Sequence, residues 1–595
     1  MATRVRQYRA LELPEIISGI LVLGVVLWEA CFEPRTADAL SRLLFTEGIH
    51  LVLCGLVWFN TLSVLTHIVA VLVRRRLPSR LLSCQLGIGL LASFVFSGGV
   101  WDFLPDYSYW GSLLLGLIMG LFSLINLVTY MRESRQSLQQ GRRRRWSPAV
   151  VFFSTMVTFV LVSALVLMTP GASKVPLSFV DAFFTCASAA SITGLTCIDI
   201  SSTLNPLGKL VVLIDFQVGA MGVMTFTYFV LLMLGRKLNM GDSSTLSSIL
   251  DQESANIIPS LLKAVVLVTF SIELVGAVLL YHQWLGNPAV PQQHLWFYAL
   301  FHAVSAFCNA GITLFPEGMA QAGVVDNFSG QLVMLLLVMA GTLGFGVYLE
   351  LLMRLHRRMR GTPNPPRWST HTWLVIRVSV IVLVMGFCGL ALLSWLEPSD
   401  HPHSFGFNTI WESLWNTVGR SAGFNISDID SYGPVYHIYM CVLMFVGGNP
   451  AGTGGGVFAP VVALCVLEIV RVLRGQQDVQ IHSRRIARTT VERAMATVVL
   501  SIFWIVVTTM ILLMAEPDIA RSGYGVLRML YLEVSAYTTT GFTIVPPSEL
   551  SDFSKMLITV NMLFGRMGMF TFMLLFIKPK PPQAFRYPET RLPLN

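Results

Sequence analysis

SAYTTTGFT (Ser535–Thr543) is the last of four segments in this chain that share one pattern around a glycine. The earlier three are SAASITGLT (Ser188–Thr196), SAFCNAGIT (Ser305–Thr313) and TVGRSAGFN (Thr417–Asn425). The aligned glycines are separated by 117, 112 and 118 residues, and they are Gly194, Gly311, Gly423 and Gly541. A period this regular indicates four copies of one structural unit. The competing interpretation is four ordinary turns between hairpin spans, and the common register of the segments argues against it.

The composition of the chain indicates that most of it lies in lipid. Of the 595 residues, 54% are hydrophobic and 12% are charged, whereas a soluble globular protein has roughly 25% charged residues. A soluble enzyme, a disordered tail protein and a nucleic-acid-binding protein are therefore excluded. The nine cysteines form no C-x-x-C motif and have no metal-ligand spacing, so neither a metal site nor a disulfide framework is expected. No cleavable signal peptide is expected either.

Twelve apolar runs are long enough to cross a bilayer, which needs roughly 20 residues of helix. Four come early in the chain and eight follow in pairs, one pair around each glycine segment. The runs are 14–33, 48–73, 81–101, 111–131, 148–169, 207–234, 259–284, 329–353, 373–396, 434–470, 494–515 and 555–577.

The positive charges of the chain gather on one side of these twelve expected spans. Of the 41 lysines and arginines, 32 lie at one set of alternate span ends, which include both termini. Because such ends face the cytoplasm, both termini are predicted to be cytoplasmic. The run Arg142–Arg145 lies close to a span, so we interpret it as a topology and lipid-headgroup anchor rather than a nucleic-acid patch.

The segment between the two spans of each pair is too apolar for an exposed loop and too short for a span. We expect it to form a short re-entrant helix, beginning near Asp181, Tyr298, Trp411 and Leu530, followed by the extended glycine segment. Backbone that is neither helix nor barrel is tolerated at membrane depth only where it lines a cavity or is buried in protein. The four segments are therefore predicted to line one pore.

The predicted fold is an all-α polytopic membrane protein. It has four span–pore-helix–span repeats around one pseudo-fourfold pore, plus about four extra N-terminal transmembrane helices. The expected divisions are 1–146 for the extra helices, 147–240, 255–360, 370–475 and 490–580 for pore repeats one to four, and 581–595 for a cytoplasmic tail.

Such a pore would use its backbone to select a cation. Rings of carbonyl oxygens can replace the water that an ion loses on entry. Glycine adopts backbone angles that other residues avoid and places no side chain in the path of the ion. The carbonyl-rich C-terminal ends of the re-entrant helices would also favour a cation.

These four segments resemble the selectivity filters of the Trk/Ktr/HKT superfamily of potassium and sodium transporters. Three other stretches are similar to the same superfamily: LIDFQVGAMGVMTF (Leu213–Phe226), GGNPAGTGGG (Gly447–Gly456) and GRMGMFT (Gly565–Thr571). The resemblance covers about residues 148–577. It implies that the protein takes up potassium as a channel or symporter, with a glycine-lined filter and an intramembrane gating loop.

The resemblance also assigns roles to single residues. The filter would contain Thr193, Gly194, Asn309, Ala310, Gly311, Ser421, Ala422, Gly423, Thr540 and Gly541. Potassium would lie at the backbone carbonyls of Ile192, Thr193, Asn309, Ala310, Ser421, Ala422, Thr539 and Thr540. A serine at the first filter glycine goes with sodium preference in the superfamily, so four glycines favour potassium. From its position inside the third segment, Arg420 is expected to hydrogen-bond filter backbone, with repulsion of the ion as the alternative.

The gate implied by the resemblance is a glycine-rich loop below the filter, with an arginine opposite it. Its residues would be Gly447, Gly448, Pro450, Gly452, Gly454, Gly455, Gly456 and Arg566. Phe458 stands where the superfamily often has a lysine. Arg566 is expected in the middle of the 555–577 span, as an electrostatic barrier or alternatively as an ion-pair partner of Asp215 or Glu273. Those two acids are themselves expected either as hydrogen-bonded groups between helices or beside the permeation path.

The resemblance further implies a homodimer in the bacterial inner membrane with a cytoplasmic nucleotide-binding regulatory subunit of the RCK type. The basic stretch 471–493 is a candidate docking surface, with simple topology charge as the alternative. Membrane lipid is an expected partner and nucleic acid is not. No covalently bound cofactor is expected, and K+ or Na+ would be the transported ion.

Three alternatives stay open at this point. One is a sodium-permeable or poorly selective cation transporter of the same superfamily. Another is the channel-like subunit of a potassium-pumping ATPase, against which the GRMGMFT stretch argues. The last is a membrane-embedded enzyme, for which the spans supply no facing set of catalytic residues.

Overall fold

The computed structural model describes residues 148–222, 258–359, 368–396, 406–450, 452–481 and 484–568, together with Leu21, Val57, Asn60, Thr61 and Val64. The four expected early spans, the Arg142–Arg145 anchor and the 581–595 tail lie outside the main described ranges.

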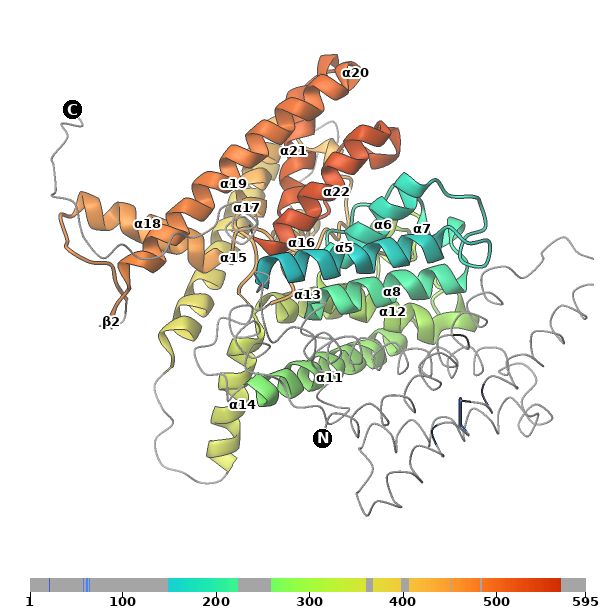
Figure 1. Ribbon diagram of the computed structural model, residues 1–595, viewed down its shortest axis with the longest axis horizontal. Coiled ribbons are helices and arrows are strands. Elements are labelled where there is room, and N and C mark those ends of the chain that lie inside the picture. The colour runs from blue at the N-terminus through green and yellow to red at the C-terminus, as the bar shows by residue number, and fades with distance from the viewer. Residues whose placement is uncertain are drawn as a thin grey trace, which may run out of the picture.

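The regular secondary structure of the described chain is almost entirely helical (Figure 1). Its first half contains α5 (Pro148–Leu167), α6 (Phe179–Ser191), α7 (Ile200–Thr203), α8 (Pro206–Met221), α11 (Ile258–Trp284), α12 (Leu295–Cys308), α13 (Phe328–Thr342) and α14 (Phe345–Met359). Its second half contains α15 (Thr370–Leu396), α16 (Phe407–Gly419), α17 (Pro434–Phe445), α18 (Ala459–Leu473), α19 (Arg488–Ala515), α20 (Pro517–Arg521), α21 (Gly525–Tyr537) and α22 (Asp552–Met567). One small hairpin pairs β1 (Gln480–Ile481) with β2 (Arg484–Arg485) in antiparallel register.

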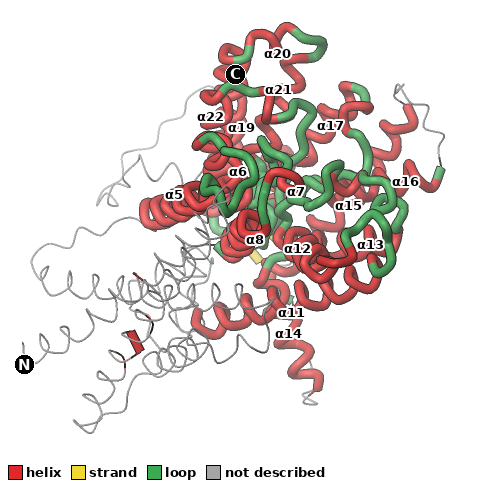
Figure 2. Tube along the Cα trace, turned by 90° about the vertical axis from the view of Figure 1, so that its right-hand side faces the viewer, coloured by secondary structure: helices red, strands yellow, loops and turns green. Residues whose placement is uncertain are grey.

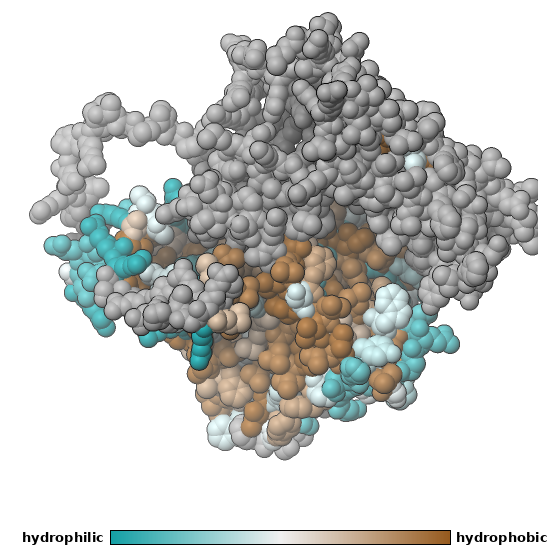
Figure 3. Space-filling model, turned by 90° about the horizontal axis from the view of Figure 1, so that it is seen from below, coloured by the Kyte–Doolittle hydropathy of each residue, from teal (hydrophilic) through white to brown (hydrophobic). Residues whose placement is uncertain are grey.

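Three described helices are each long and apolar enough to cross a membrane: Val265–Trp284 within α11, α15 and α19. Their outer faces expose large apolar side chains, such as Leu274 (63%), Met385 (61%) and Phe503 (63%). A continuous apolar surface with hydrophilic residues at its margins is visible in Figure 3. Since water would penalise so much exposed apolar area, these faces fit a lipid environment.

The expected single span 329–353 is wrong in one respect, because two helices occupy it. α13 and α14 together are long and apolar enough to cross, but they are bent by 95° at the break between them. Gly344 lies in that break with a φ of +86°, a backbone conformation that glycine adopts without a steric penalty. The sequence signal was the glycine-rich run from Gly341 to Gly346.

The four short helices that precede the glycine segments are α6, α12, α16 and α21, and each begins a few residues before its expected start. In α6 the reason is a helix cap: the hydroxyl of Ser178 accepts a hydrogen bond from the amide of Asp181 at 3.1 Å. A serine in this position satisfies an amide that would otherwise have no partner.

The packing of these short helices closes into a circle. α8 packs on α12, α13 on α16, α17 on α21, and α22 returns to α6. In Figure 1 the red α22 accordingly lies beside the blue-green α5 and α6, although they come from opposite ends of the described chain. Each short helix is thereby enclosed by longer ones.

An ion pair lies where the circle closes. Lys555 Nζ on α22 is 2.8 Å from Asp181 Oδ1 on α6, across 374 residues of sequence. The lysine side chain is 9% exposed and the aspartate 25%, so water screens this pair less than it screens a surface pair.

Replacing Lys555 by methionine should lower the thermal stability of the detergent-purified protein. The loss should be about 1–2 kcal/mol, between that of an exposed ion pair and that of a buried charged hydrogen bond. The matched control is Arg488→Met, which removes a pair with side chains 87% and 62% exposed and should leave the melting temperature nearly unchanged. Equal melting temperatures for the two variants would mean that the Lys555 pair does not stabilise the closure.

Candidate functional site

Each short helix is followed by a glycine with a positive φ. The angles are +89° at Gly194, +67° at Gly311, +72° at Gly423 and +95° at Gly541. L-residues with side chains rarely adopt this backbone conformation. We call these four residues the glycine ring, because their contacts run in a closed sequence.

Each glycine of the ring packs against the carbonyl oxygen that precedes a neighbouring ring glycine. A Cβ atom added to Gly194 would lie 2.6 Å from Ala310 O, and one added to Gly311 would lie 2.3 Å from Ala422 O. A Cβ atom on Gly423 would lie 2.3 Å from Thr540 O, and one on Gly541 would lie 2.1 Å from Thr193 O. These distances are shorter than any normal contact, so each position excludes a side chain. The structure thus brings all four sequence-predicted glycine segments together around one centre.

Within the described ranges, the backbone carbonyls of the two residues before each ring glycine have no hydrogen-bond donor. Among the described residues, no group donates to the oxygens of Ile192, Thr193, Asn309, Ala310, Ser421, Ala422, Thr539 or Thr540. Buried carbonyls are nearly always paired with protein or water. Eight unpaired oxygens in one small region therefore leave room for a polar or cationic partner.

Side chains of the short helices hold the extended segments in place, with a different donor in each case. Ser305 Oγ donates to Ile312 O at 2.7 Å, and Trp415 Nε1 donates to Phe424 O at 3.0 Å. In the fourth segment, the Gly541 amide donates to Ser535 Oγ at 3.0 Å. Figure 2 shows loops gathered between α6, α12 and α17, with helices around them.

The third segment differs from the other three. The others pass through left-handed residues at Ile192, Asn309 and Thr539, with φ of +63°, +59° and +51°, whereas Ser421, the residue at the same position of the third segment, has no positive φ. The expectation that the Arg420 side chain hydrogen-bonds filter backbone is wrong. Its Nη1 donates instead to Leu443 O at 3.2 Å and to Val446 O, where α17 ends.

The glycine-rich loop (Gly447–Gly456) connects α17 to α18, and Ala451 within it lies outside the described residues. Its two ends are tied together, because the amide of Gly447 donates to Val457 O at 2.8 Å and that of Gly448 to Gly455 O at 3.0 Å. A Cβ atom on Gly455 would lie 1.7 Å from Thr539 Oγ1, so the loop is in direct contact with the fourth glycine segment.

Thr453 fastens this loop to the second glycine segment. Its hydroxyl accepts from Asn309 Nδ2 at 2.5 Å and donates to Phe307 O at 3.0 Å, and its amide donates to Gly341 O at 3.1 Å. From the sequence, only the backbone carbonyl of Asn309 is expected to have a role, and no local pattern indicates that its side chain contacts Thr453.

Arg566 connects the glycine-rich loop to α8. It donates to Thr453 O at 2.7 Å and, through Nη2, to Gly219 O at 2.9 Å and Ala220 O at 3.1 Å. Arg566 lies in the last turn of α22, which ends at Met567, and residues 569–577 of the expected 555–577 span lie outside the described residues. Its guanidinium lies at the C-terminal end of α8, where the helix dipole favours a positive charge.

The expected ion pairs of Arg566 with Asp215 or Glu273 are absent from the described residues. Asp215 accepts from Ser163 Oγ at 2.5 Å, and Glu273 accepts from Gln217 Nε2 at 3.1 Å. Both acids are therefore hydrogen-bonded groups between helices.

A third buried acid, Glu533 on α21, was not singled out from the sequence. It accepts from Thr508 Oγ1 at 2.5 Å and from Asn561 Nδ2 at 2.7 Å. The sequence could have indicated this acid, because it is a carboxyl group in the apolar helix just before the fourth glycine segment. A charge at membrane depth is costly without partners, so such a residue is expected to have hydrogen-bond donors nearby.

With this geometry in view, comparison with known proteins identifies the family. The family model for TrkH, described as a cation transport protein, matches residues 122–586. The chain belongs to the TrkH family of cation transport proteins. Members of this family are ion transporters rather than enzymes, and the family together with the apolar helices makes the chain a multi-pass cell-membrane protein.

Two curated relatives and one solved structure extend the TrkH-family match. The Ktr system potassium uptake protein B of Bacillus subtilis is 29% identical over 76% of this chain and 98% of its own length. The potassium/sodium uptake protein NtpJ of Enterococcus hirae is 26% identical over 76% of this chain and 98% of its own length. The crystal structure of the potassium transporter TrkH from Vibrio parahaemolyticus covers 83% of this chain and 97% of that chain, with a TM-score of 0.59 and 16% identity. This last match shows a likeness of fold.

A Gly423→Ala substitution should destabilise the glycine ring. The new methyl group would meet Thr540 O, and the positive φ alone costs roughly 1–3 kcal/mol for a residue with a side chain. We expect a lower yield of monodisperse protein and a lower melting temperature in detergent. Gly523→Ala is the control, because its Cβ meets nothing within 4 Å. A Gly423→Ala protein as stable as this control would argue against close packing in the ring.

Proposed function

We propose that the protein takes up potassium across the cell membrane and that the glycine ring is its selectivity filter. The observation that supports this most strongly is the closed circle of contacts, together with the eight carbonyl oxygens that accept no hydrogen bond from described residues. Carbonyl oxygens arranged in this way can replace the hydration shell of a permeating cation.

The choice of potassium as the ion has two supports. All four ring positions are glycine, and curated relatives that the chain matches over most of its length have potassium uptake in their names. One of them is also named for sodium uptake. A sodium-permeable or poorly selective transporter is therefore the second candidate function.

We also propose that the glycine-rich loop is the gate below this filter. Its contacts support this role, since it touches the second segment through Thr453 and the fourth through Gly455. Six of its ten residues are glycines, so few side chains hinder movement of its backbone. Arg566 would hold the loop through Thr453 O and would place a positive charge beside the path of the ion.

The fourfold arrangement is part of the proposal. Pore repeats at 147–240, 255–360, 370–475 and 490–580, with extra helices before them and both termini cytoplasmic, are supported by the circular packing of the short helices and by the positive-inside count.

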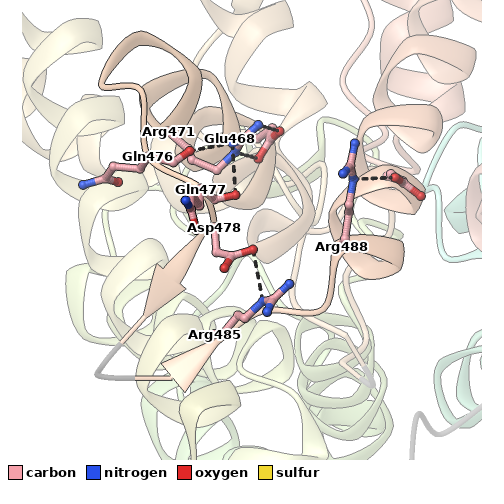
Figure 4. A network of polar contacts seen from close by, with 8 residues as sticks. Glu468, Arg471, Gln476, Gln477, Asp478, Arg485 and Arg488 are labelled. Atoms are coloured by element: carbon pink, nitrogen blue, oxygen red, sulfur yellow. Dashed lines mark hydrogen bonds and ion pairs between the residues drawn. The ribbon is translucent and has the colours of Figure 1, made fainter. Parts of the chain in front are cut away.

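The proposed partners are a second copy of the chain and a cytoplasmic nucleotide-binding subunit. The candidate docking stretch 471–493 forms the β1–β2 hairpin and its flanks (Figure 4). Three of its arginines pair within their own neighbourhood: Arg471 with Glu468, Arg485 with Asp478 and Arg488 with Glu492. These pairs shape the hairpin and reduce the charge available for docking.

A Gly194→Ser substitution should raise sodium permeability relative to potassium. Of the four ring positions, Gly194 has the longest distance, 2.6 Å, between an added Cβ atom and the neighbouring carbonyl oxygen, Ala310 O. A serine is therefore tolerated best at this position, although it still displaces that carbonyl. The measurement is ion flux into liposomes that contain the purified protein. Gly286→Ser is the control, since it has a similar φ of +78° but nothing within 4 Å. Unchanged relative sodium permeability in Gly194→Ser would contradict the filter assignment.

An Arg566→Gln substitution should raise cation flux while potassium preference persists. The change removes a fixed charge that opposes a cation by roughly 2 kcal/mol at about 7 Å and a dielectric of about 20, and it weakens the hold on Thr453. Flux in liposomes should rise about thirtyfold. Arg521→Gln, on the distant α20, should leave flux unchanged. A folded Arg566→Gln protein with equal or lower flux would make this arginine a structural residue only.

A further inference from the structure

A cavity of about 350 Å³ lies beside the glycine-rich loop, between α13, α14, α15 and α16. Its size is within the range of roughly 300–1,000 Å³ that is typical of small-molecule sites. Most of its wall is apolar, with contributions from Met339, Ala340, Val380 and Leu383. The third glycine segment and the glycine-rich loop line the inner end of this cavity. Their proposed roles in ion selection and gating do not explain why the cavity has an apolar outer part.

The outer end of the cavity opens toward lipid. Leu336 on α13 and Val380 on α15 lie at this end and are 55% and 53% exposed. α15 is one of the three helices that can cross the membrane alone. A second, apolar cavity of about 330 Å³ shares Leu336 and Ala340 with the first. Species that enter from this side must therefore come from the hydrocarbon region of the bilayer.

The inner end of the cavity is polar. Asn449 of the glycine-rich loop is 3% exposed, and its Nδ2 donates to Thr342 O at 2.9 Å and to Ser379 Oγ at 3.0 Å. Its Oδ1 has no hydrogen-bond partner within the described part of the chain. Arg420 also lines this end. Its guanidinium forms no ion pair with a described acid, and only its Nη1 has a partner there.

We propose that this cavity binds a fatty acid from the membrane. The acyl chain would occupy the apolar outer part, and the carboxylate would accept hydrogen bonds from the Arg420 guanidinium at the inner end. An uncompensated guanidinium at membrane depth is costly, and a carboxylate is the anion whose planar geometry suits it. A neutral diacyl lipid supplies no such group at the end of its chain.

Occupation of the cavity would hold the glycine-rich loop where it is. Gly447, Gly448 and Asn449 form part of the wall, so a loop that moves sideways out of the pore must enter this space. Protein interiors are close-packed, and a displaced segment needs an empty volume to receive it. A bound fatty acid removes that volume and should lower potassium flux. This effect on flux, unlike the binding itself, rests on the proposed function.

Binding can be tested with a photoactivatable, diazirine-bearing palmitic acid in phosphatidylcholine vesicles that contain the full-length protein. Peptide mapping should place adducts on the cavity walls of α13 and α15, and unlabelled oleic acid should displace them about tenfold better than methyl oleate. Val380→Trp, at the mouth, should abolish these adducts. Val384→Trp is the matched control, because Val384 is also 53% exposed, one turn further along α15, and does not line the cavity.

The same vesicles give the flux measurement. Oleic acid should lower potassium flux severalfold in the wild type and in Val384→Trp, and should have no such effect in Val380→Trp. Adducts spread evenly over the lipid-facing helices, or equal displacement by methyl oleate, would overturn the proposed site. Adducts at the expected positions, together with a measurable flux that oleic acid does not change, would overturn the proposal that a bound fatty acid keeps the glycine-rich loop in place. If no variant conducts potassium, the proposed function fails, while the adduct map still decides whether the site exists.

Discussion

Backbone carbonyls without donors, held inside a membrane protein, are the constraint on which the rest of this structure depends. Lipid supplies no hydrogen bonds, so irregular backbone at that depth needs protein or water around it. The chain meets this need with four short helices that point their ends at one centre and with longer helices that enclose them. Only glycine fits at Gly194, Gly311, Gly423 and Gly541, because each lies against a carbonyl of another segment.

A second set of contacts joins this ring to the loop beneath it. Thr453 is at its centre, because it contacts Asn309 of the second segment, Gly341 of α13 and Arg566 of α22. Arg420 fixes the other end of the same loop, through the carbonyls at the end of α17. Movement of the loop at Thr453 would therefore break the charged hydrogen bond from Arg566, which is stronger than a neutral one.

The features that could be predicted from the sequence are those with a local signal. The four glycine segments, the short helices before them and the break at Gly447–Gly456 all follow from glycine spacing and apolar runs. The bend at Gly344 had such a signal, but the apolar length of 329–353 outweighed it. The contacts that close the circle of helices had no local sequence signal, because 374 residues separate Lys555 from Asp181. The partners of Arg566 are backbone carbonyls, which every residue has, so no residue type in the sequence identifies them.

We propose that the transported cation sheds its water at the glycine ring. The most direct measurement is an anomalous diffraction map of the protein crystallised with Tl+, a potassium substitute that scatters strongly. We expect anomalous density enclosed by the ring, within coordinating distance of carbonyls such as those of Thr193, Ala310, Ala422 and Thr540. Well-ordered crystals with an empty ring, and with Tl+ density at another place in the membrane region, would contradict it.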